Sequence, residues 1–408
     1  MLYNLAIYFY LLGVVVASFF SAKVKKMWRG ERDAFDVLKR EVDSAAKYVW
    51  FHAASLGEFE QGRPIIERLR ASHPDYKILL TFFSPSGYEV RQNYEGADIV
   101  CYLPIDTPLN AIRFLRLIRP VMAFFIKYEF WYNYLHILKY RNVPTYSVSS
   151  IFRPEQVFFR WYGRHYAGVL RCFTHFFVQN EQSRQLLNKI GITAVSIAGD
   201  TRFDRVLQIK EQSKRLPIVE AFASQAEHVF VAGSSWAPDE DIFLPYFNAH
   251  DNWRIVIAPH VIAEEHLQQI EQKLEMPSVR YTRTTPEEAA NARCLIIDCF
   301  GLLSSIYHYG EVAYVGGGFG VGIHNVLEAA VWDVPVIFGP NNTHFREAQG
   351  LKSNGGGFEI ADSSTFNTII DNFSDDKHYL KFCGDKAGEY VKSQAGATDA
   401  VLAEVDLD

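Results

Sequence analysis

The chain has 408 residues, which at about 150 residues per domain corresponds to roughly two or three domains. Hydrophobic residues make up 49% of it and charged residues 22%, a globular composition that excludes an intrinsically disordered chain. The 41 basic and 47 acidic residues leave a net charge of −6, which argues against a general nucleic-acid-binding protein. The 5 cysteines form no Cys-x-x-Cys pair, so the sequence predicts neither a disulfide framework nor a zinc site and favours a reducing compartment.

The amino-terminal segment is the first predicted element. Residues 2–20 carry no charge, and a helix over them, rising about 1.5 Å per residue, approaches the ~30 Å thickness of a hydrocarbon core. Basic residues follow it directly and none precedes it, which argues against a cleaved signal peptide and predicts that the rest of the chain is cytoplasmic. We therefore expect a membrane anchor over residues 1–22 that either spans the membrane or lies shallowly in one leaflet. A buried core helix is the alternative.

Apolar runs of strand length alternate with helical stretches through the rest of the chain. The runs occupy residues 48–54, 77–83, 120–128, 143–149 and 172–179 and, after a polar segment with Pro217, residues 228–235, 253–260, 293–298, 311–317 and 334–339. Helices are expected between them, as at Glu58–Ser72, Pro108–Ile118 and Asn180–Ile190. This alternation indicates parallel sheets covered on both faces. The expected fold class is therefore α/β, with two doubly wound domains over residues 23–208 and 226–408 and a linker over 209–225.

The first polar motif follows the first of these strands. Ser55 and Gly57 form a turn, and Glu58 then opens a helix. In such sheets ligands bind at the carboxyl ends of the strands, and with two domains the cleft between them is the default site. Glu58 is thus a candidate general base, or a carboxylate that only complements the positive end of the helix dipole.

The second motif is a serine-rich loop after the next strand. Ser84, Ser86 and Gly87 precede a helix. The amides and hydroxyls of such a loop can hold an anion or a sugar, and the alternative is that a serine merely caps the helix.

Two charged motifs complete the first domain. Lys127 and Glu129 stand where a buried run ends, so they are expected to point into the cleft or to pair with a neighbouring loop. Arg202 lies just before the linker, where a cation can bind an anionic donor or its departing phosphate. The alternative for Arg202 is that it fixes the domain hinge.

The second domain carries a glycine-rich strand-to-helix turn over residues 316–330. We expect its helix to start near His324–Asn325 and the amides near Gly322–Asn325 to approach a phosphate. Glu328, one turn into that helix, can accept hydrogen bonds from ribose hydroxyls. The motif is not the dinucleotide fingerprint, because no acidic ribose partner follows at the usual distance.

Two further loops of the second domain follow predicted strands. His260, at the end of one strand, can contact a base or a phosphate, although a lone histidine is more often structural. Residues 298–303 open a helix after another strand.

In this order, the motifs resemble those of the Kdo transferases, the 3-deoxy-D-manno-oct-2-ulosonic acid transferases of lipopolysaccharide synthesis. The resemblance covers essentially the whole chain, from the apolar amino terminus through S-L-G-E, S-P-S-G, E-F-W, G-D-T-R-F-D and A-G-S-S to G-I-H-N-V-L-E-A-A with I-F-G-P. It implies the GT-B arrangement, in which two Rossmann-like domains face each other, here with an amino-terminal membrane-anchor helix. It also implies an inverting transfer of Kdo from CMP-Kdo to the lipid A precursor, lipid IVA, at the cytoplasmic face of the inner membrane.

The resemblance assigns catalytic roles to three residues. The general base of the family falls on Glu58, its second glutamate on Glu129 and the cation of G-S-L-K-F-D on Arg202. Where the family often has E-T-E-L-W-P, this chain has Lys127 in place of the first glutamate and Tyr132 in place of the proline. An arginine in place of a lysine keeps the charge but changes its geometry.

The resemblance also assigns the substrate contacts. The P-R-H loop of the family reads Ala258-Pro259-His260, its M-G-E loop reads Phe300-Gly301-Leu302, and its N-P-L-E loop reads Asn325-Val326-Leu327-Glu328. An arginine and a carboxylate of the family pattern are therefore missing. The expected contacts to CMP and the donor are Pro259, His260, Phe300, Gly301, Leu302, Gly322, Asn325, Val326, Leu327 and Glu328. The expected acceptor contacts are Ser55, Gly57, Ser84, Ser86 and Gly87.

The chemistry of CMP-Kdo implies a role for each charge. Glu58 takes the proton of the attacking acceptor hydroxyl, Arg202 and the glycine-turn amides stabilise the departing phosphate, and Glu129 stabilises the positive anomeric centre or orients the acceptor. The sequence has no Asp-x-Asp metal motif, so we expect no cofactor and no obligatory metal. The expected partners are CMP-Kdo, the lipid A precursor and inner-membrane lipid, with no nucleic acid.

Three alternatives stay open from the sequence. The chain can be another glycosyltransferase of the same fold, a nucleotide-sugar epimerase, or a membrane-tethered protein that binds nucleotide sugars without catalysis, because fold alone does not separate these functions.

Overall fold

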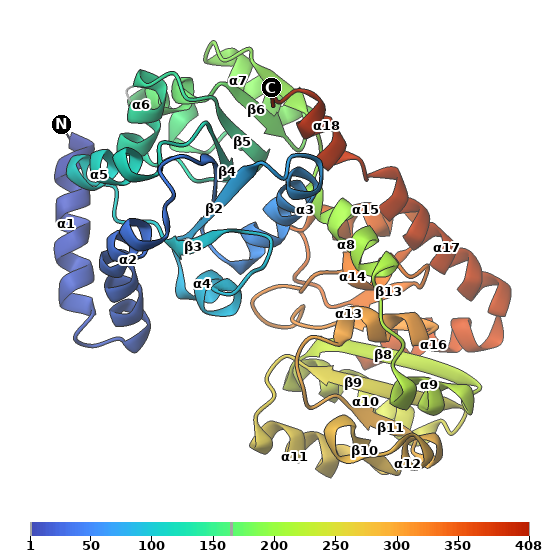
Figure 1. Ribbon diagram of the computed structural model, residues 1–408. Coiled ribbons are helices and arrows are strands. Elements are labelled where there is room, and N and C mark those ends of the chain that lie inside the picture. Colours follow the sequence, from blue (N-terminus) through green and yellow to red (C-terminus); the bar gives the residue numbers. More distant parts are fainter. Residues whose placement is uncertain (1, 164–165, 408) are drawn as a thin grey trace. The chain divides into compact units, whose positions relative to one another are not determined.

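Two parallel sheets form because the apolar runs of the sequence are buried on both faces of their strands. The computed structural model describes residues 2–163 and 166–407 (Figure 1). The chain folds into two units, Met1–Arg205 with Ala395–Asp408, and Val206–Gln394.

The sheet of the first unit has seven strands in the order β3-β2-β1-β4-β5-β6-β7. They are β1 (Lys47–Ala53), β2 (Tyr76–Phe82), β3 (Ile99–Tyr102), β4 (Met122–Ile126), β5 (Thr145–Ser150), β6 (His175–Val178) and β7 (Val195–Ile197). The helices are α1 (Leu2–Ala17), α2 (Ala22–Glu41), α3 (Leu56–Ser72), α4 (Pro85–Arg91), α5 (Pro108–Ile118), α6 (Tyr132–Tyr140), η1 (Val157–Phe159), η2 (Trp161–Gly163), η3 (Tyr166–Cys172), α7 (Glu181–Lys189), α8 (Thr201–Glu211) and α18 (Ala397–Ala403).

The sheet of the second unit also has seven strands, in the order β10-β11-β9-β8-β12-β13-β14. They are β8 (His228–Ser235), β9 (Trp253–Pro259), β10 (Ser278–Arg280), β11 (Cys294–Ile296), β12 (Val312–Val315), β13 (Val336–Phe338) and β14 (Gly357–Glu359). The helices are α9 (Pro217–Ser224), α10 (Ala237–Ala249), α11 (Glu264–Lys273), η4 (Tyr281–Arg283), α12 (Pro286–Asn291), α13 (Leu303–Ile306), η5 (Tyr307–Tyr309), α14 (Leu327–Ala330), α15 (Arg346–Asn354), α16 (Ser363–Asp375) and α17 (Lys377–Ser393). The predicted pair of doubly wound α/β sheets is confirmed.

The predicted linker over residues 209–225 is mostly helical. Helix α8 runs through the junction to Glu211, and α9 begins at Pro217. The linker was predicted because this segment is polar and contains Pro217, but proline fits the first turn of a helix, where its missing N–H has no intrahelical partner.

The carboxyl-terminal residues 395–408 belong to the first unit, which differs from the predicted boundary. Val401 and Val405 of this segment are buried in the core that covers one face of the first sheet. Asp204 accepts hydrogen bonds from the amides of Gly396 and Thr398, both at 2.6 Å, and so fixes the start of α18. The chain therefore returns to the first unit after it has formed the second unit.

The amino-terminal helix lies against the first unit. Helix α1 ends at Ala17, and among the described residues no helix is both long enough and apolar enough to span a membrane. The prediction of a membrane-spanning anchor is therefore not supported. The physical reason is that the uncharged run divides, since the chain turns after Ala17 and α2 begins at Ala22, capped by Ser21.

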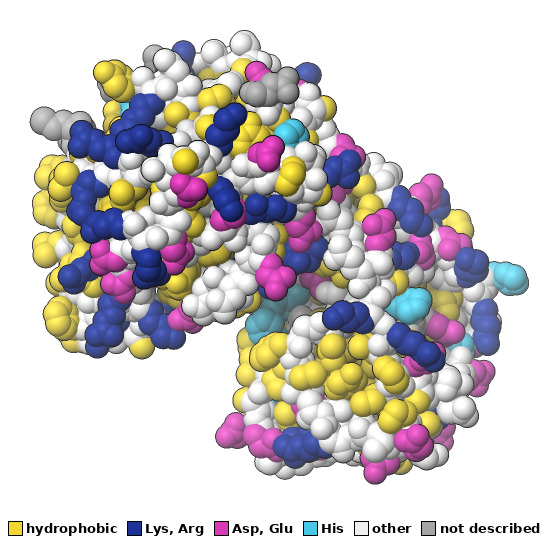
Figure 2. Space-filling view, in the orientation of Figure 1, with side chains coloured by type: hydrophobic (Ala, Val, Ile, Leu, Met, Phe, Trp, Pro, Cys, Tyr) yellow, Lys and Arg dark blue, Asp and Glu magenta, His cyan; other side chains and the backbone are white. Residues whose placement is uncertain are grey.

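One face of α1 packs on the unit and the other is exposed. Val14 is 5% exposed and packs with Met27 and Tyr102, whereas Phe9 and Leu12 are 67% and 60% exposed. In Figure 2, hydrophobic side chains gather along the edge that α1 forms, at the left of the view.

Candidate active site

The loops after β1 and β2 lie together at the carboxyl end of the first sheet, because these strands pair in parallel. The amide of Ser84 donates to the carbonyl of Ala54 at 2.8 Å and joins the two loops. Ser55 is the N-cap residue of α3, and its hydroxyl donates to the carboxylate of Glu58 in the first turn. Glu58 therefore lies in the first turn of a helix at the strand end, but this helix begins at Leu56, two residues earlier than predicted, so Gly57 belongs to the helix and not to a turn.

Lys127 reaches this carboxylate from the end of β4. Its backbone lies in the left-handed region, with φ 61°, and its amide donates to the carbonyl of Val148 at 2.8 Å. Its ammonium nitrogen lies 4.0 Å from Oε1 of Glu58. The residue that departs from the family pattern thus forms an ion pair with the candidate base.

Arg202 is held by Asp200, which the sequence analysis did not select. The Nε and Nη2 groups of Arg202 donate to Oδ2 of Asp200 at 2.9 and 2.8 Å. Gln61 donates to the other carboxylate oxygen at 3.1 Å. Burial by itself would raise the pKa of Asp200, but the positive charges of Arg202 and Lys127 outweigh burial and lower it. The signal was present in the sequence, as an acid two residues before the expected cation.

Tyr128 shows that these charges share one environment. Burial is the main cause of its raised pKa; Asp200 and Glu58 raise this pKa further, whereas Arg153 and Arg202 lower it. The fold therefore brings the candidate base and the candidate cation into one charged cluster, which we define as Glu58, Lys127, Asp200 and Arg202.

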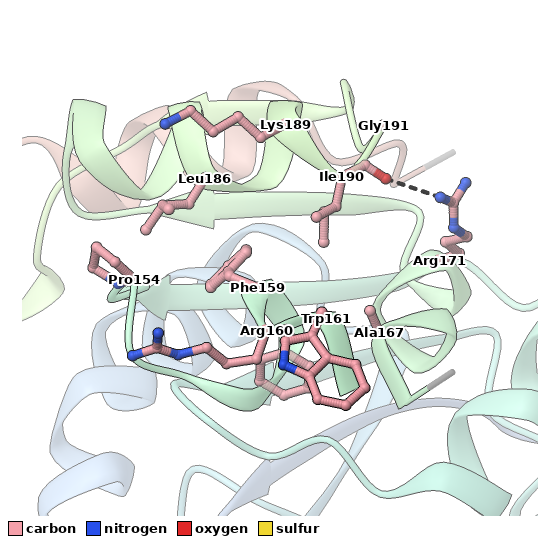
Figure 3. A pocket seen from close by; sticks show the side chains of 11 residues that line it. Pro154, Phe159, Arg160, Trp161, Ala167, Arg171, Leu186, Lys189, Ile190 and Gly191 are labelled. Atoms are coloured by element: carbon pink, nitrogen blue, oxygen red, sulfur yellow. Dashed lines mark hydrogen bonds between the residues drawn. The ribbon is translucent and has the colours of Figure 1, made fainter. Parts of the chain in front are cut away.

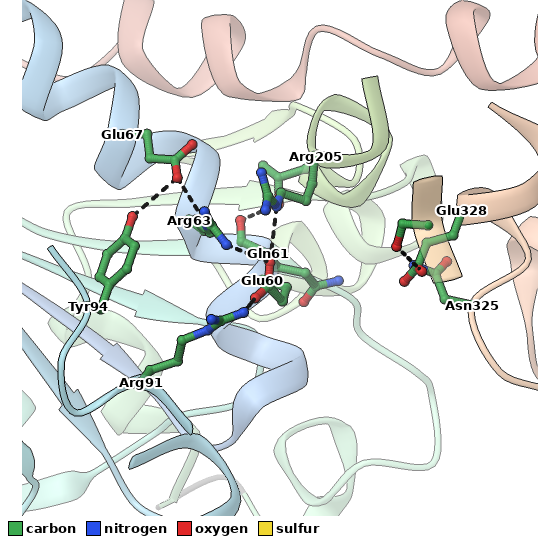
Figure 4. A network of polar contacts seen from close by, with 11 residues as sticks. Glu60, Gln61, Arg63, Glu67, Arg91, Tyr94, Arg205, Asn325 and Glu328 are labelled. Carbon is green, nitrogen blue, oxygen red and sulfur yellow. Dashed lines mark hydrogen bonds and ion pairs between the residues drawn. The ribbon is translucent and has the colours of Figure 1, made fainter. Parts of the chain in front are cut away.

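A second network, centred on Glu60, supports the helices that carry this cluster (Figure 4). Its carboxylate receives Arg91 at 2.7 Å from α4 and Arg205 at 3.0 Å from α8. Arg63 lies 3.7 Å from Glu60 and 2.6 Å from Glu67. Because Glu60 follows Glu58 closely on α3 and Arg205 follows Arg202 on α8, the network fixes the two helix starts relative to each other.

Glu129 is fixed by two aromatic side chains. Its Oε2 atom lies 3.1 Å from Nε2 of His52, which is fully buried, and accepts the indole N–H of Trp131 at 2.7 Å. The other ring nitrogen of His52, Nδ1, lies 2.9 Å from the hydroxyl of Thr81, which accepts the indole N–H of Trp50 at 2.8 Å. The histidine was not selected from the sequence, although it precedes the S-L-G-E motif.

Of the two glycines predicted to contact the acceptor, close packing requires Gly87 in the serine loop but not Gly57. The hydroxyls of Ser84 and Ser86 contact each other at 2.6 Å. A Cβ at Gly87 would lie 2.2 Å from the ring of Phe82, so this glycine is required by its neighbour. At Gly57 the nearest atom to an added Cβ is 3.8 Å away, so close packing does not require glycine there.

Three aromatic rings stack in the second unit, at the ends of its central strands. The ring centroids of Trp236 and His260 are 4.6 Å apart, and those of His260 and His324 are 4.3 Å apart. Burial first, and then the neighbouring His260, lower the pKa of His324. His260 is exposed, whereas Pro259 is buried at the end of β9. His324 belongs to the glycine-rich motif and Trp236 directly follows the A-G-S-S motif, but neither was chosen as a site residue.

The glycine-rich turn differs in part from its prediction. The amides of Gly322 and His324 donate to the carbonyls of Gly317 and Gly316 at 3.2 and 3.1 Å, so the turn itself uses them. The expectation that these two amides point at a phosphate is wrong. The helix starts at Leu327, later than predicted, because the turn stays irregular while it makes these bonds.

Glu328 is held at the start of α14 by two polar neighbours. Asn325 donates to its Oε1 at 3.1 Å, as drawn in Figure 4, and Ser304 donates to its Oε2 at 2.6 Å. The side chains of Val326 and Leu327 are fully buried, so only their backbone can serve a ligand. Glu328 is thus the polar side chain that this part of the motif presents.

The remaining predicted contact loop of the second unit, residues 300–302, is mostly exposed. Phe300 is 81% exposed, and Gly301 has φ 88°, which glycine adopts without strain. Leu302 precedes α13 as its cap residue. In the described part of the chain, no group of three or more His, Cys, Asp or Glu side chains is arranged to hold a metal ion.

The chain is similar to one known protein family and to several named proteins. Residues 29–205 match the family model described as 3-deoxy-D-manno-octulosonic-acid transferase (kdotransferase). The 3-deoxy-D-manno-octulosonic acid transferase of Aquifex aeolicus is 26% identical over 349 residues, covering 82% of this chain and 90% of the relative. The enzyme of the same name from Chlamydia trachomatis is 23% identical over 392 residues, covering 92% of this chain and 88% of the relative.

A solved structure shows the same fold. UDP-GlcNAc 2-epimerase from Neisseria meningitidis, bound to UDP-GlcNAc, aligns over 87% of this chain and 98% of its own, with a TM-score of 0.59 and 13% identity. At this identity the likeness concerns the fold alone. The resemblance indicated by the motifs is confirmed by the family match and the named relatives.

Proposed function

We propose that this relative of the Kdo transferases transfers Kdo from CMP-Kdo to a hydroxyl of the lipid A precursor, with inversion at the anomeric carbon. The observation that carries the proposal is the charged cluster at the carboxyl end of the first sheet. It contains the carboxylate of Glu58, paired with Lys127, and a second cation, Arg202, paired with Asp200, whose pKa both cations lower. Transfer from a nucleotide-activated sugar acid needs both kinds of charge, one to accept a proton and the other to meet anions.

Glu58 is the proposed general base. As the acceptor hydroxyl attacks the anomeric carbon, its O–H bond breaks and the proton passes to Glu58, while the bond to the CMP phosphate breaks on the opposite face. The contacts from Ser55 and Lys127 keep the carboxylate in one orientation at the helix start. Such positioning matters because proton transfer requires hydrogen-bond reach.

Arg202 is the proposed partner of the departing phosphate. An arginine presents a rigid fork of N–H donors, which suits a phosphate oxygen pair. Asp200 binds one edge of that fork and therefore sets the plane of the guanidinium. Glu129, fixed by His52 and Trp131, is proposed to stabilise the positive anomeric centre or to orient the acceptor.

The second unit is the proposed binding site for CMP-Kdo. Glu328 is oriented by Asn325 and Ser304 and is proposed to accept from ribose hydroxyls. His260 stands where the family has an arginine-containing loop, and its stack with Trp236 and His324 offers flat surfaces for a base and imidazole donors for a phosphate. No metal or cofactor enters this proposed mechanism.

The exposed face of α1 is proposed to lie in one leaflet at the cytoplasmic side of the inner membrane. Leu5, Phe9, Leu12 and Val16 are each more than half exposed, with values of 54%, 67%, 60% and 52%. The following helix α2 opens with the basic residues of the sequence AKVKK, which suits anionic headgroups.

The deciding experiment incubates the full chain with CMP-Kdo and lipid IVA and follows CMP release together with product mass. Kdo transfer predicts that CMP and a glycolipid heavier by one or more Kdo units appear together. An epimerase would alter the donor without any acceptor, and a binding protein would bind CMP-Kdo without releasing CMP. Either result would overturn the proposal.

A further inference from the structure

A large cavity lies in the first unit, away from the charged cluster. It has a volume of about 820 Å³ and is bordered by residues of η1, η2 and η3 on one side and by α7 with the turn after it on the other (Figure 3). Volumes of about 300–1,000 Å³ are typical of sites for small organic ligands. None of the cluster residues lines it, so it is a separate site.

The charged side chains around this cavity all have the same sign. Arg160, Arg171 and Lys189 line it, and among the described residues its lining contains no Asp or Glu. Arg171 is held in place, since its Nη2 donates to the carbonyl of Ile190 at 2.8 Å and its own carbonyl accepts from Lys139 at 2.6 Å. Backbone carbonyls do not neutralise a guanidinium, so the lining favours an anion.

The floor of the cavity is apolar. Leu186 and Ile190 of the α7 side face Phe159 of the opposite side in Figure 3. Trp161, on the same lining, is 82% exposed and makes an edge-on ring contact of 5.7 Å with Tyr162, which is 62% exposed. Exposed Trp and Tyr side chains are typical of surfaces that meet the interface of a lipid bilayer.

We propose that this cavity binds an anionic phospholipid, with the phosphate between Arg160, Arg171 and Lys189 and an acyl chain on the apolar floor. A free phosphate would leave the apolar lining uncovered, and a zwitterionic lipid would not use the uniform positive charge. Continuity with α1 supports a bilayer source, because Tyr166 of η3 stacks on Tyr3 of α1 at 6.2 Å. The proposal goes beyond the transfer reaction and does not depend on it.

The test measures binding of short-chain lipids by calorimetry, with the full chain and below the micelle concentration. Dihexanoyl-phosphatidylglycerol should bind at least about tenfold more tightly than dihexanoyl-phosphatidylcholine, and inorganic phosphate should not compete. Arg160→Gln combined with Lys189→Gln should weaken phosphatidylglycerol binding by about tenfold or more, since each basic residue near an anionic lipid contributes measurably to affinity. Arg184→Gln is the matched control, because Arg184 lies on α7 like Lys189 but pairs with Glu181 outside the cavity.

Each of the following results would overturn the proposal. They are equal binding of the two lipids, competition by inorganic phosphate, no effect of the double substitution, or an equal effect of Arg184→Gln. Displacement of phosphatidylglycerol by lipid IVA would assign the cavity to the acceptor instead. All three substitutions are at exposed positions, and thermal melting confirms folding. Transfer to detergent-dispersed acceptor should stay at the wild-type rate in the double variant, so failure of the transfer reaction and failure of lipid binding are observed separately.

Discussion

The hydroxyl of Tyr3, in the first turn of α1, donates a hydrogen bond of 2.7 Å to Asp106 in the loop after β3. Asp106 also accepts the amides of Asn133 and Tyr134 at 2.9 and 3.1 Å at the start of α6, which follows the Glu129 loop. The apolar helix is thus bound to the fold by a buried carboxylate, and the same carboxylate fixes the helix beside a candidate site residue.

We expect Tyr3→Phe to destabilise the first unit, by about 1.5–3 kcal/mol when Asp106 is ionised, the range for a hydrogen bond to a charged group. Burial raises the pKa of Asp106 from 3.8 to about 6 in spite of its hydrogen bonds. Because the folded pKa is the higher one, Asp106 lowers stability as pH rises through about 4 to 6, and loss of the Tyr3 bond, which holds that pKa down, extends the decline to higher pH. Urea unfolding of the wild type and the variant at pH 5 and pH 8 measures the loss of stability at each pH.

The control for this prediction is Tyr8→Phe, since Tyr8 lies on the same helix and is 51% exposed. Equal losses of stability at the two pH values for Tyr3→Phe would contradict the role of Asp106.

Glu31→Gln should stabilise the protein above neutral pH. Glu31 is 2% exposed, neither carboxylate oxygen has a hydrogen-bond partner among the described residues, and burial raises its pKa from 4.5 to about 8. The folded state therefore holds this proton more tightly, and stability falls by about 1.4 kcal/mol per pH unit between these two values. A neutral amide removes that dependence. Thermal melting from pH 5 to pH 8.5 should show a smaller decline for the variant than for the wild type, and parallel curves would refute the prediction.

Glu58→Gln should lower the rate of Kdo transfer by about 10²–10⁴, the usual cost of losing a general base. Glutamine keeps the size of the side chain and the contact with Ser55, so folding and CMP affinity should stay near wild type. Steady-state transfer, melting temperature and calorimetric CMP binding are measured together. Glu67→Gln, on the same helix, controls for the change of charge. A rate within about threefold of wild type, which is less than 1 kcal/mol of barrier, would exclude the base.

Glu328→Ala should weaken CMP binding by about 1.5–3 kcal/mol, which is the loss of a charged hydrogen bond to ribose. Ser304→Ala is the matched control, because it removes a partner of Glu328 at 2.6 Å but leaves the carboxylate in place. Calorimetry on folded variants should show a large loss for the first and a small one for the second. Equal small effects would make Glu328 a purely structural helix residue.

The sequence by itself determined the two sheets and placed Glu58 in the first turn of a helix, although that helix begins at Leu56. Long apolar strands such as Lys47–Ala53 and His228–Ser235 were recognisable because burial on both faces requires continuous apolar residues. Four short strands, β3, β7, β10 and β14, were not predicted. All four are edge strands of the two sheets, and three of them, β7, β10 and β14, are partly exposed, so they lack the continuous buried apolar run that marks a central strand.

Only the tertiary structure decided which charges meet. Glu58 and Lys127 form an ion pair, and His260 stacks on His324, although 69 and 64 residues of sequence separate the members of these pairs. The same holds for the return of residues 395–408 to the first unit and for the division of the uncharged amino-terminal run into a helix and a turn. Local sequence patterns set which backbone conformation and which face of a strand or helix are favourable. Contacts between distant residues depend on strand order and packing, which exist only once the sheets have formed.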